Sequence, residues 1–338
     1  MGYRIAIFGH GSIGKRHLRI VRESLPDAEI LVVRHSENSE VPKSADRVTS
    51  SIEEAVAFAP HMAVIANPAP FHLRSSSAML EAGCHVLVEK PIATETDGIE
   101  ELLVRAKALG LVFQVGYNLR FHPSLIEFRR LVQQDSVGTI HTVRCEIGHH
   151  LSAWRPVSDY RQGVSARRDL GGGVLLELSH EIDYLQWVFG EVVWVGAWTG
   201  HVSWLDVDVE DCAQLTLCHR SPSLEGEVVA SLNMDFIRHD PTRYCTAIGS
   251  EGSLRWNGMS GTVECFRAGA GAWTETFRHD TGRDETYMAQ WSHFLHCVKT
   301  GEKPIAGAEE GLSALRVVEA ARLSAGRSGM RQNVSAST

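Results

Sequence analysis

The chain of 338 residues has no cysteines in metal-binding or disulfide patterns. Its seven cysteines are odd in number, scattered, and never spaced as Cys-x-x-Cys. This pattern argues against a disulfide framework and against a zinc ribbon. We therefore predict a reducing compartment, the cytoplasm.

The chain also lacks an excess of positive charge. Lysine and arginine total 33 against 41 aspartates and glutamates, for a formal net charge of −8. A nucleic-acid partner is disfavoured, because no basic excess exists to neutralise phosphates. No run reaches the roughly 18 apolar residues of a membrane helix, and the N-terminal apolar run is too short for a signal peptide. We predict neither a membrane partner nor a targeting segment.

Residues 1–121 alternate short apolar runs with helical patterns. Strands are predicted at 4–8, 29–33, 62–66, 85–88 and 112–115, and helices at 15–24, 52–57, 73–82 and 97–109. This alternation predicts βαβ units and a parallel sheet, here a Rossmann domain.

Residues 122–338 have a different pattern and are predicted to form a second domain of the α+β class. Strands are predicted at 139–147, 192–202, 209–218, 228–234, 245–248 and 262–266, and helices at 174–189, 287–298 and 307–325. Few helices separate the strands, so we expect a large, mostly antiparallel open sheet. The polar tail 326–338 is expected to fray.

The turn after the first predicted strand has the spacing of a dinucleotide site. Gly9, Gly11 and Gly14 form G-x-G-x-x-G between a strand and a helix, the context that this motif requires. Such glycines allow a tight turn, a close approach to a pyrophosphate and close helix packing. We assign to the cofactor the whole turn, Gly9, His10, Gly11, Ser12, Ile13 and Gly14. The alternative is a flavodoxin-like domain with an incidental glycine turn.

The end of the second strand indicates which cofactor binds. An acidic residue there would bind the ribose of NAD, but this strand ends in Arg34, His35 and Ser36. An arginine suits a 2′-phosphate, so NADP is favoured and NAD is possible. In the alternative interpretation Arg34 is solvated and Glu37 binds the ribose.

Ligands of open α/β sheets bind beyond the carboxyl ends of the strands. The third strand is followed by Asn67, Pro68 and, a few residues later, His72; the fourth is followed by Glu89, Lys90 and Pro91. We expect both groups, with Asn118 from the following segment, to border the nicotinamide. The alternative makes Lys90 a surface lysine beside a salt-bridging Glu89.

A second group of polar residues lies on the predicted helix 174–189. Glu177, His180 and Asp183 follow one another at intervals of three, so a continuous helix would place them on one face. A carboxylate, an imidazole and a carboxylate in line suit acid–base catalysis. A metal site is disfavoured for want of a third cluster, and the remaining alternative is a solvated polar face.

The segment before that helix is rich in aromatic and basic residues. Trp154 and Tyr160 suit stacking on sugar rings, and Arg155 and Arg161 suit clamping a carboxylate or phosphate. A negatively charged sugar fits these groups. The alternative is a loop that orders against a neighbouring subunit.

Four stretches together resemble the glucose–fructose oxidoreductase/inositol dehydrogenase/rhizopine-catabolism (Gfo/Idh/MocA) family: GHGSIG, VEKPIA, GYNLRFHP and GGGVLLELSHEIDYLQWVFG. The resemblance implies a Rossmann domain followed by an open antiparallel sheet, and a nicotinamide-dependent oxidoreductase acting on a sugar or polyol. By the same resemblance, Lys90 matches the lysine of the EKP motif and His180 the catalytic histidine. Glu177 departs from the family, which commonly has aspartate four residues before the histidine. The segment 149–173 is similar to a subgroup of bacterial surface-sugar gene clusters.

We therefore expect reversible hydride transfer between NADP and a secondary alcohol or ketone of a sugar. Lys90 would polarise or protonate the oxygen, and His180 would exchange the proton with help from Glu177 or Asp183. Substrate-binding residues are predicted to be Lys90, Arg120, Trp154, Arg155, Tyr160, Arg161 and His180. Two other classes stay open, a silent nucleotide-binding sensor and a glycoside hydrolase or lyase using NAD transiently. A homodimer or homotetramer is expected, because an open sheet with a bare face usually finds a partner.

Overall fold

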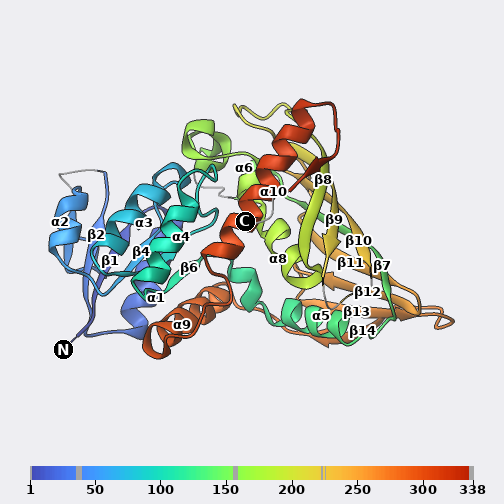
Figure 1. Cartoon of the computed structure of the whole chain (residues 1–338), viewed down its shortest axis with the longest axis horizontal. Coiled ribbons are helices and arrows are strands. Elements are labelled where there is room, and N and C mark those ends of the chain that lie inside the picture. The colour runs from blue at the N-terminus through green and yellow to red at the C-terminus, as the bar shows by residue number, and fades with distance from the viewer. Residues whose placement is uncertain (1, 36–39, 155–158, 222–223, 225, 335–338) are drawn as a thin grey trace. The chain divides into compact units, whose positions relative to one another are not determined.

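The computed structural model describes residues 2–35, 40–154, 159–221, 224 and 226–334. The chain divides into two compact units (Figure 1). The first comprises Met1–Asn118 with Asp284–Leu312, and the second comprises Leu119–Arg283 with Ser313–Thr338. The two contiguous domains predicted from the sequence did not include the return of residues 284–312 to the first unit.

The first unit is built on a parallel sheet, as predicted. Its strands are β1 (Arg4–Phe8), β2 (Glu29–Val33), β3 (Arg47–Thr49), β4 (Met62–Ile65), β5 (His85–Val88) and β6 (Phe113–Val115). Their order is β3-β2-β1-β4-β5-β6, and every neighbouring pair is parallel. The edge strand β3 was not predicted, because three residues with little apolar character carry no alternating pattern. The ends of β1, β4 and β5 therefore lie side by side at one edge.

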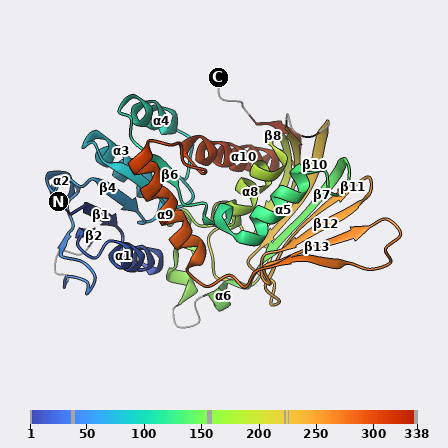
Figure 2. The same ribbon diagram turned by 90° about the horizontal axis from the view of Figure 1, so that it is seen from below.

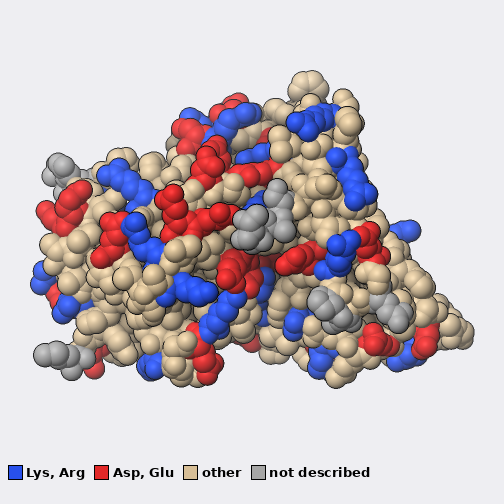
Figure 3. All heavy atoms as spheres, viewed as in Figure 1, with Lys and Arg blue, Asp and Glu red and all other residues tan. Residues whose placement is uncertain are grey.

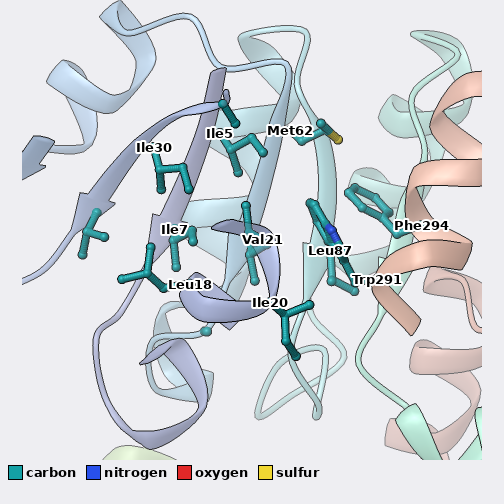
Figure 4. Packing of buried hydrophobic residues seen from close by; sticks show 14 of the residues in the cluster. Ile5, Ile7, Leu18, Ile20, Val21, Ile30, Met62, Leu87, Trp291 and Phe294 are labelled. Atoms are coloured by element: carbon teal, nitrogen blue, oxygen red, sulfur yellow. The ribbon is translucent and has the colours of Figure 1, made fainter. Parts of the chain in front are cut away.

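Helices cover this sheet in two groups. They are α1 (Ser12–Ser24), α2 (Ile52–Ala57), α3 (His72–Glu81), α4 (Ile99–Ala108) and α9 (Glu285–Thr300). Helix α3 contacts both α2 and α4, and α1 contacts α9. Figure 4 shows Leu18 and Val21 of α1 and Trp291 of α9 packed against the same face of the strands. Burial of the α9 residues Trp291, Phe294 and Cys297 in this core explains why the segment belongs to the first unit.

The second unit contains the larger sheet. Its strands are β7 (Ile140–Gly148), β8 (Glu191–Gly200), β9 (Cys212–Arg220), β10 (Glu227–Asp235), β11 (Thr242–Gly249), β12 (Gly252–Asn257), β13 (Thr262–Arg267), β14 (Thr274–Arg278) and β15 (Gln332–Asn333). The order is β14-β13-β12-β11-β7-β10-β9-β8-β15. Only β7 and β10 are parallel among the described pairs, which confirms the mostly antiparallel sheet.

The described part of the tail, up to residue 334, is more ordered than expected. Gln332 and Asn333 pair with Val195 and Trp194 of β8, and the guanidinium of Arg331 lies over the Trp194 ring at 4.4 Å. Backbone hydrogen bonds to an edge strand hold these polar residues, although they have no apolar pattern of their own.

Helices lie against one face of the large sheet, as Figures 1 and 2 show. They are α5 (Pro123–Gln133), α7 (Val174–Glu177) and α8 (Ser179–Phe189), while α10 (Ala308–Gly326) joins the units in sequence. Residues of β10 alternate between exposed and buried along the strand. The exposed positions form the face that these helices leave uncovered.

Within the described ranges, every helix is too short or too polar to cross a membrane. Positive and negative side chains are interspersed over the face drawn in Figure 3.

Candidate active site

The glycine turn of the first unit has room for a pyrophosphate. Gly9 has φ +91°, and a side chain there would meet the Ala66 carbonyl. A side chain at Gly14 would meet the Gly9 carbonyl, whereas one at Gly11 would find nothing within 4 Å. The packing thus requires glycine at 9 and 14 and leaves open space at 11. The first turn of α1 has no acidic residue, so its amides face this space without a repelling charge. These residues fit a dinucleotide.

The surroundings of this turn are cationic. Arg34 follows β2, and its guanidinium lies 3.3 Å from Nδ1 of His10 and donates to the Glu40 carbonyl at 2.6 Å. Burial, with the charges of Lys15 and Arg34, lowers the pKa of His10. His35 is exposed, and Ser36 and Glu37 lie outside the described residues. A guanidinium at the end of β2 thus lies beside the glycine turn.

His72 bridges two strand ends. Its Nε2 lies 2.7 Å from the Asn67 carbonyl after β4, and its Nδ1 lies 2.8 Å from the Pro91 carbonyl after β5. Burial lowers the pKa of His72, and the two carbonyls offset this only in part. The neutral ring has one N–H to donate between two acceptors. Asn67 also donates to Ser75 at 3.0 Å, and Pro68 leads into the short 3-10 helix η1 (Ala69–Phe71).

The segment Glu89-Lys90-Pro91 differs from a solvated surface turn. The Lys90–Pro91 peptide is cis, and Lys90 is half-buried. Glu89 is buried, and its Oε1 accepts a hydrogen bond from Nε2 of His17 at 2.6 Å. Burial raises the pKa of Glu89, but the bond from His17 and the charges of His17 and Lys90 outweigh it and leave the pKa below its usual value. Glu89 is therefore a buried carboxylate that binds both His17 and the backbone N–H of Lys90.

Asn118, the last residue of the first unit's initial segment, is buried. Its amide donates to the hydroxyl of Thr286 in α9 at 2.7 Å. The returning helix thus holds the predicted cofactor residue in place.

In the second unit, the predicted helix 174–189 is interrupted. Helix α7 ends at Glu177, Leu178 has φ −99° and ψ 23°, and α8 begins at Ser179. Glu177 and His180 are therefore not on one continuous helix face, which corrects the geometry expected from their spacing. Glu177 accepts a hydrogen bond from the hydroxyl of Ser165 at 2.6 Å, and His180 is half-buried.

Asp183 forms an ion pair with Arg120. The guanidinium donates to both carboxylate oxygens, at 3.0 and 2.8 Å, and both side chains are buried. Arg120 also lies near the ring of Trp187, at 5.8 Å. This joins a residue predicted for substrate to one predicted for catalysis.

The aromatic and basic segment is held by local bonds. The indole N–H of Trp154, in the short helix α6 (Leu151–Trp154), donates to the His149 carbonyl at 3.0 Å. The hydroxyl of Tyr160 accepts from the Asp206 amide at 3.2 Å, and Arg161 pairs with Asp159 at 2.8 Å. Arg155 lies outside the described residues.

This combination of a nucleotide-type turn, a lysine at the same sheet edge and a histidine-bearing helix in a second unit matches a known family. Residues 3–117 match the model described as "Oxidoreductase family, NAD-binding Rossmann fold", and residues 129–331 match its C-terminal alpha/beta domain. The chain belongs to the Gfo/Idh/MocA family.

Relatives within the Gfo/Idh/MocA family are distant. Myo-inositol dehydrogenase Hyg17 of Streptomyces leeuwenhoekii is 28% identical over 95% of this chain and 97% of its own. Inositol 2-dehydrogenase/D-chiro-inositol 3-dehydrogenase of Shouchella clausii is 29% identical, over 56% of this chain and only 54% of its own length.

Solved structures share the fold. Levoglucosan dehydrogenase in complex with NADH and levoglucosan superposes with a TM-score of 0.85 at 18% identity, over 99% of this chain and 100% of that one. The WlbA dehydrogenase of Bordetella pertussis, in complex with NADH and UDP-GlcNAcA, gives 0.79 at 20% identity over the whole of both chains.

Two buried polar residues near the predicted site residues were missed at the level of sequence. His17 follows the glycine turn by three residues and pairs with Glu89. Glu181, fully buried, pairs with Arg243 of β11 at 2.8 Å. The sequence did contain a signal for these pairs. A charged or titratable residue at a helix position predicted to be buried almost always has a partner. Among the described residues, no group of three or more potential ligands could hold a metal.

Proposed function

We propose that this oxidoreductase transfers a hydride reversibly between NADP and a secondary alcohol or ketone of a sugar. The observation that carries the proposal is the position of Lys90. It follows β5, Asn67 follows β4 and Gly9 follows β1, and these three parallel strands are neighbours. Lys90 therefore lies at the edge of the sheet where such folds bind their ligands.

The bound nicotinamide supplies the hydride acceptor or donor. Lys90 holds an ammonium where charge develops on the substrate oxygen, and it stabilises or protonates that oxygen. His180, from the second unit, exchanges the proton as the acid–base partner. Glu177, which is bonded to Ser165, and Asp183, which is paired with Arg120, assist His180 in this role.

The preference for NADP is supported by Arg34. Its guanidinium lies beside the glycine turn in a cationic environment, and a fork of donors suits a 2′-phosphate. The rest of the proposed cofactor site comes from the glycine turn and the strand ends: Gly9, His10, Gly11, Ser12, Ile13 and Gly14, with Asn67, Pro68, His72, Glu89, Lys90 and Asn118.

The proposed substrate is a sugar, either acidic or linked to a nucleotide. Support comes from the guanidinium groups of Arg120 and Arg161 and the rings of Trp154 and Tyr160, and from the fold shared with WlbA, solved with a UDP-linked sugar acid. Lys90 and His180 complete the set of proposed substrate residues.

The uncovered face of the large sheet supports a homodimer or homotetramer. Val229 of β10 is 38% exposed and Trp198 of β8 is 48% exposed on this sheet. The seven free cysteines suit a reducing cytoplasm. Light scattering of the purified protein tests the assembly.

The activity is tested with a panel of sugars, inositols, sugar acids and UDP-sugar acids, each assayed with NADP and with NAD. We expect stoichiometric formation of NADPH with one class of substrate. Product formation without net change of the cofactor would instead indicate a hydrolase or lyase that uses it transiently. Tight nucleotide binding without turnover on any of them would indicate a sensor.

A further inference from the structure

A histidine–carboxylate pair lies inside the first unit, next to the backbone of Lys90. Nε2 of His17 and Oε1 of Glu89 are 2.6 Å apart, and His17 is fully buried. An ionised carboxylate only accepts hydrogen bonds, so the imidazole is the donor. The pair connects α1, which begins at the glycine turn, with the end of β5.

The second oxygen of Glu89 is directed at the chain next to it. Oε2 accepts a hydrogen bond from the backbone N–H of Lys90 at 3.2 Å. One carboxylate thus bonds to the imidazole of α1 with one oxygen and to the peptide of Lys90 with the other.

The surroundings leave the pair little freedom. A side chain at Gly116, after β6, would come within 2.9 Å of Oε2 and 3.0 Å of the Glu89 Cα, so this position must lack one. On the other side, the His17 ring meets the edge of Tyr287 from α9 with centroids 6.0 Å apart. The guanidinium of Arg16 covers Tyr287 at 4.5 Å and pairs with Asp284 at 2.9 Å. Four segments of the chain therefore enclose the two groups.

We propose that His17 and Glu89 are positioning residues, which fix the peptide of Lys90 relative to the glycine turn and place a negative charge behind its ammonium. This inference rests on the proposed role of Lys90. A buried carboxylate is costly unless it is paired, so a carboxylate retained here needs its imidazole partner. An uncharged pair of equal shape would hold the peptide equally well. The charge is therefore the part of the arrangement that acts on Lys90 itself.

Three variants separate the two roles. Glu89→Gln keeps the shape and an acceptor oxygen but removes the charge. His17→Phe keeps a ring against Tyr287 but removes the donor, and His17→Gln restores a donor near the position of Nε2. The matched control is the exposed pair His296–Glu302 of the same unit, at 3.1 Å, changed as Glu302→Gln and His296→Phe.

The first readout needs no substrate. Limited acetylation with acetic anhydride at one fixed pH, quantified by mass spectrometry of the Lys90 peptide, gives the relative reactivity of its amine. We expect Glu89→Gln to raise the extent of Lys90 labelling by about threefold or more, since a nearby opposite charge favours the unreactive ammonium form. Glu302→Gln leaves the labelling of Lys90 unchanged. Unchanged Lys90 labelling in Glu89→Gln overturns the electrostatic role.

The second readout is turnover with the best substrate of the panel, beside NADPH affinity measured by fluorescence titration. We expect His17→Phe to lower kcat about tenfold to a hundredfold, as for a misplaced reacting group, with NADPH affinity nearly unchanged. His17→Gln recovers most of the loss, and His296→Phe loses nothing. Wild-type kcat in His17→Phe overturns the positioning role. If His17→Phe does not fold, wild-type kcat in His17→Leu, which also lacks the donor, has the same consequence.

A different result would contradict the proposed function. Full turnover in Lys90→Ala would remove the role of Lys90 itself. Loss of turnover in Lys90→Ala with unaltered Glu89→Gln and His17→Phe variants would leave that role in place and remove only the inference about the pair.

Discussion

The guanidinium of Arg120 and the carboxylate of Asp183 form a buried, two-pronged ion pair. The bonds are 3.0 and 2.8 Å long, and the side chains are 5% and 1% exposed. Asp183 lies one helical turn after His180 on α8, so the pair anchors the helix that carries the proposed acid–base residue. The predicted roles of Arg120 toward substrate and of Asp183 toward His180 stay predictions.

Removing either partner of this pair should destabilise the protein strongly. Arg120→Ala and Asp183→Ala would each leave an unpaired buried charge, at a cost of about 3–5 kcal/mol in the free energy of unfolding. The double variant should lose much less than the sum, because it buries neither charge. Urea denaturation measures all three. Arg278→Ala, which breaks an exposed pair with Glu275, should leave the free energy of unfolding nearly unchanged. Additive losses in the double variant would show that the two residues act independently.

Lys90 is predicted to be essential for turnover but not for nucleotide binding. Lys90→Ala should lower kcat at least about a hundredfold, the usual effect of losing a positioned acid–base group. The dissociation constant for NADPH should stay within about threefold, since the glycine turn is untouched. Lys299→Ala, an exposed lysine of α9, is the control and should behave as wild type. Near-native turnover in Lys90→Ala would place the catalytic centre elsewhere.

Arg34 should determine the choice of cofactor. Arg34→Ala should weaken NADPH binding about tenfold to a hundredfold, the worth of charge-assisted hydrogen bonds to a phosphate, while NADH binding changes little. Isothermal titration with both nucleotides measures the two effects. Arg47→Ala on the edge strand β3, where the side chain pairs with Glu29, is the control. Equal losses for both nucleotides would mean that Arg34 does not read the 2′-phosphate.

His219 should make stability depend on pH. It is fully buried in β9, Nδ1 lies 2.9 Å from the Gly190 carbonyl, and burial lowers its pKa from 6.5 to about 4. A depressed histidine pKa means that the unfolded chain takes up the proton first. The contribution of neutral His219 to the free energy of unfolding is fully present above pH 6.5. It is lost as pH falls toward 4, a loss of about 3 kcal/mol.

Thermal and urea unfolding between pH 4 and 7 will show this contribution. His219→Asn keeps an amide donor near Nδ1 without a titrating ring, so its stability should fall less steeply over that window than that of the wild type. His296→Asn, at an exposed histidine, should follow the wild-type curve. Parallel curves for His219→Asn and wild type would show that His219 is not the titrating group.

Local patterns were sufficient to predict most of the architecture. The apolar runs of β1, β2, β4 and β5, and the glycines after β1, act through neighbours a few residues away, and the structure confirms the parallel sheet. Alternating residues likewise indicated most strands of the second sheet. Weak strand patterns were missed, including β3, β12 and β14, because pairing with neighbours rather than their own sequence stabilises them. Helix α5 was also missed, although its buried Leu125, Phe128 and Val132 have helical spacing.

The sequence by itself therefore determined the two sheets, the glycine turn and the position of Lys90 at the end of a strand, because these depend on periodicity and local backbone geometry. Only the tertiary structure decided which charges are paired. His17 and Glu89 are 72 residues apart, and Arg120 and Asp183 are 63 apart. Such partners are selected by burial, since a charge removed from water takes whichever complementary group the fold brings within reach.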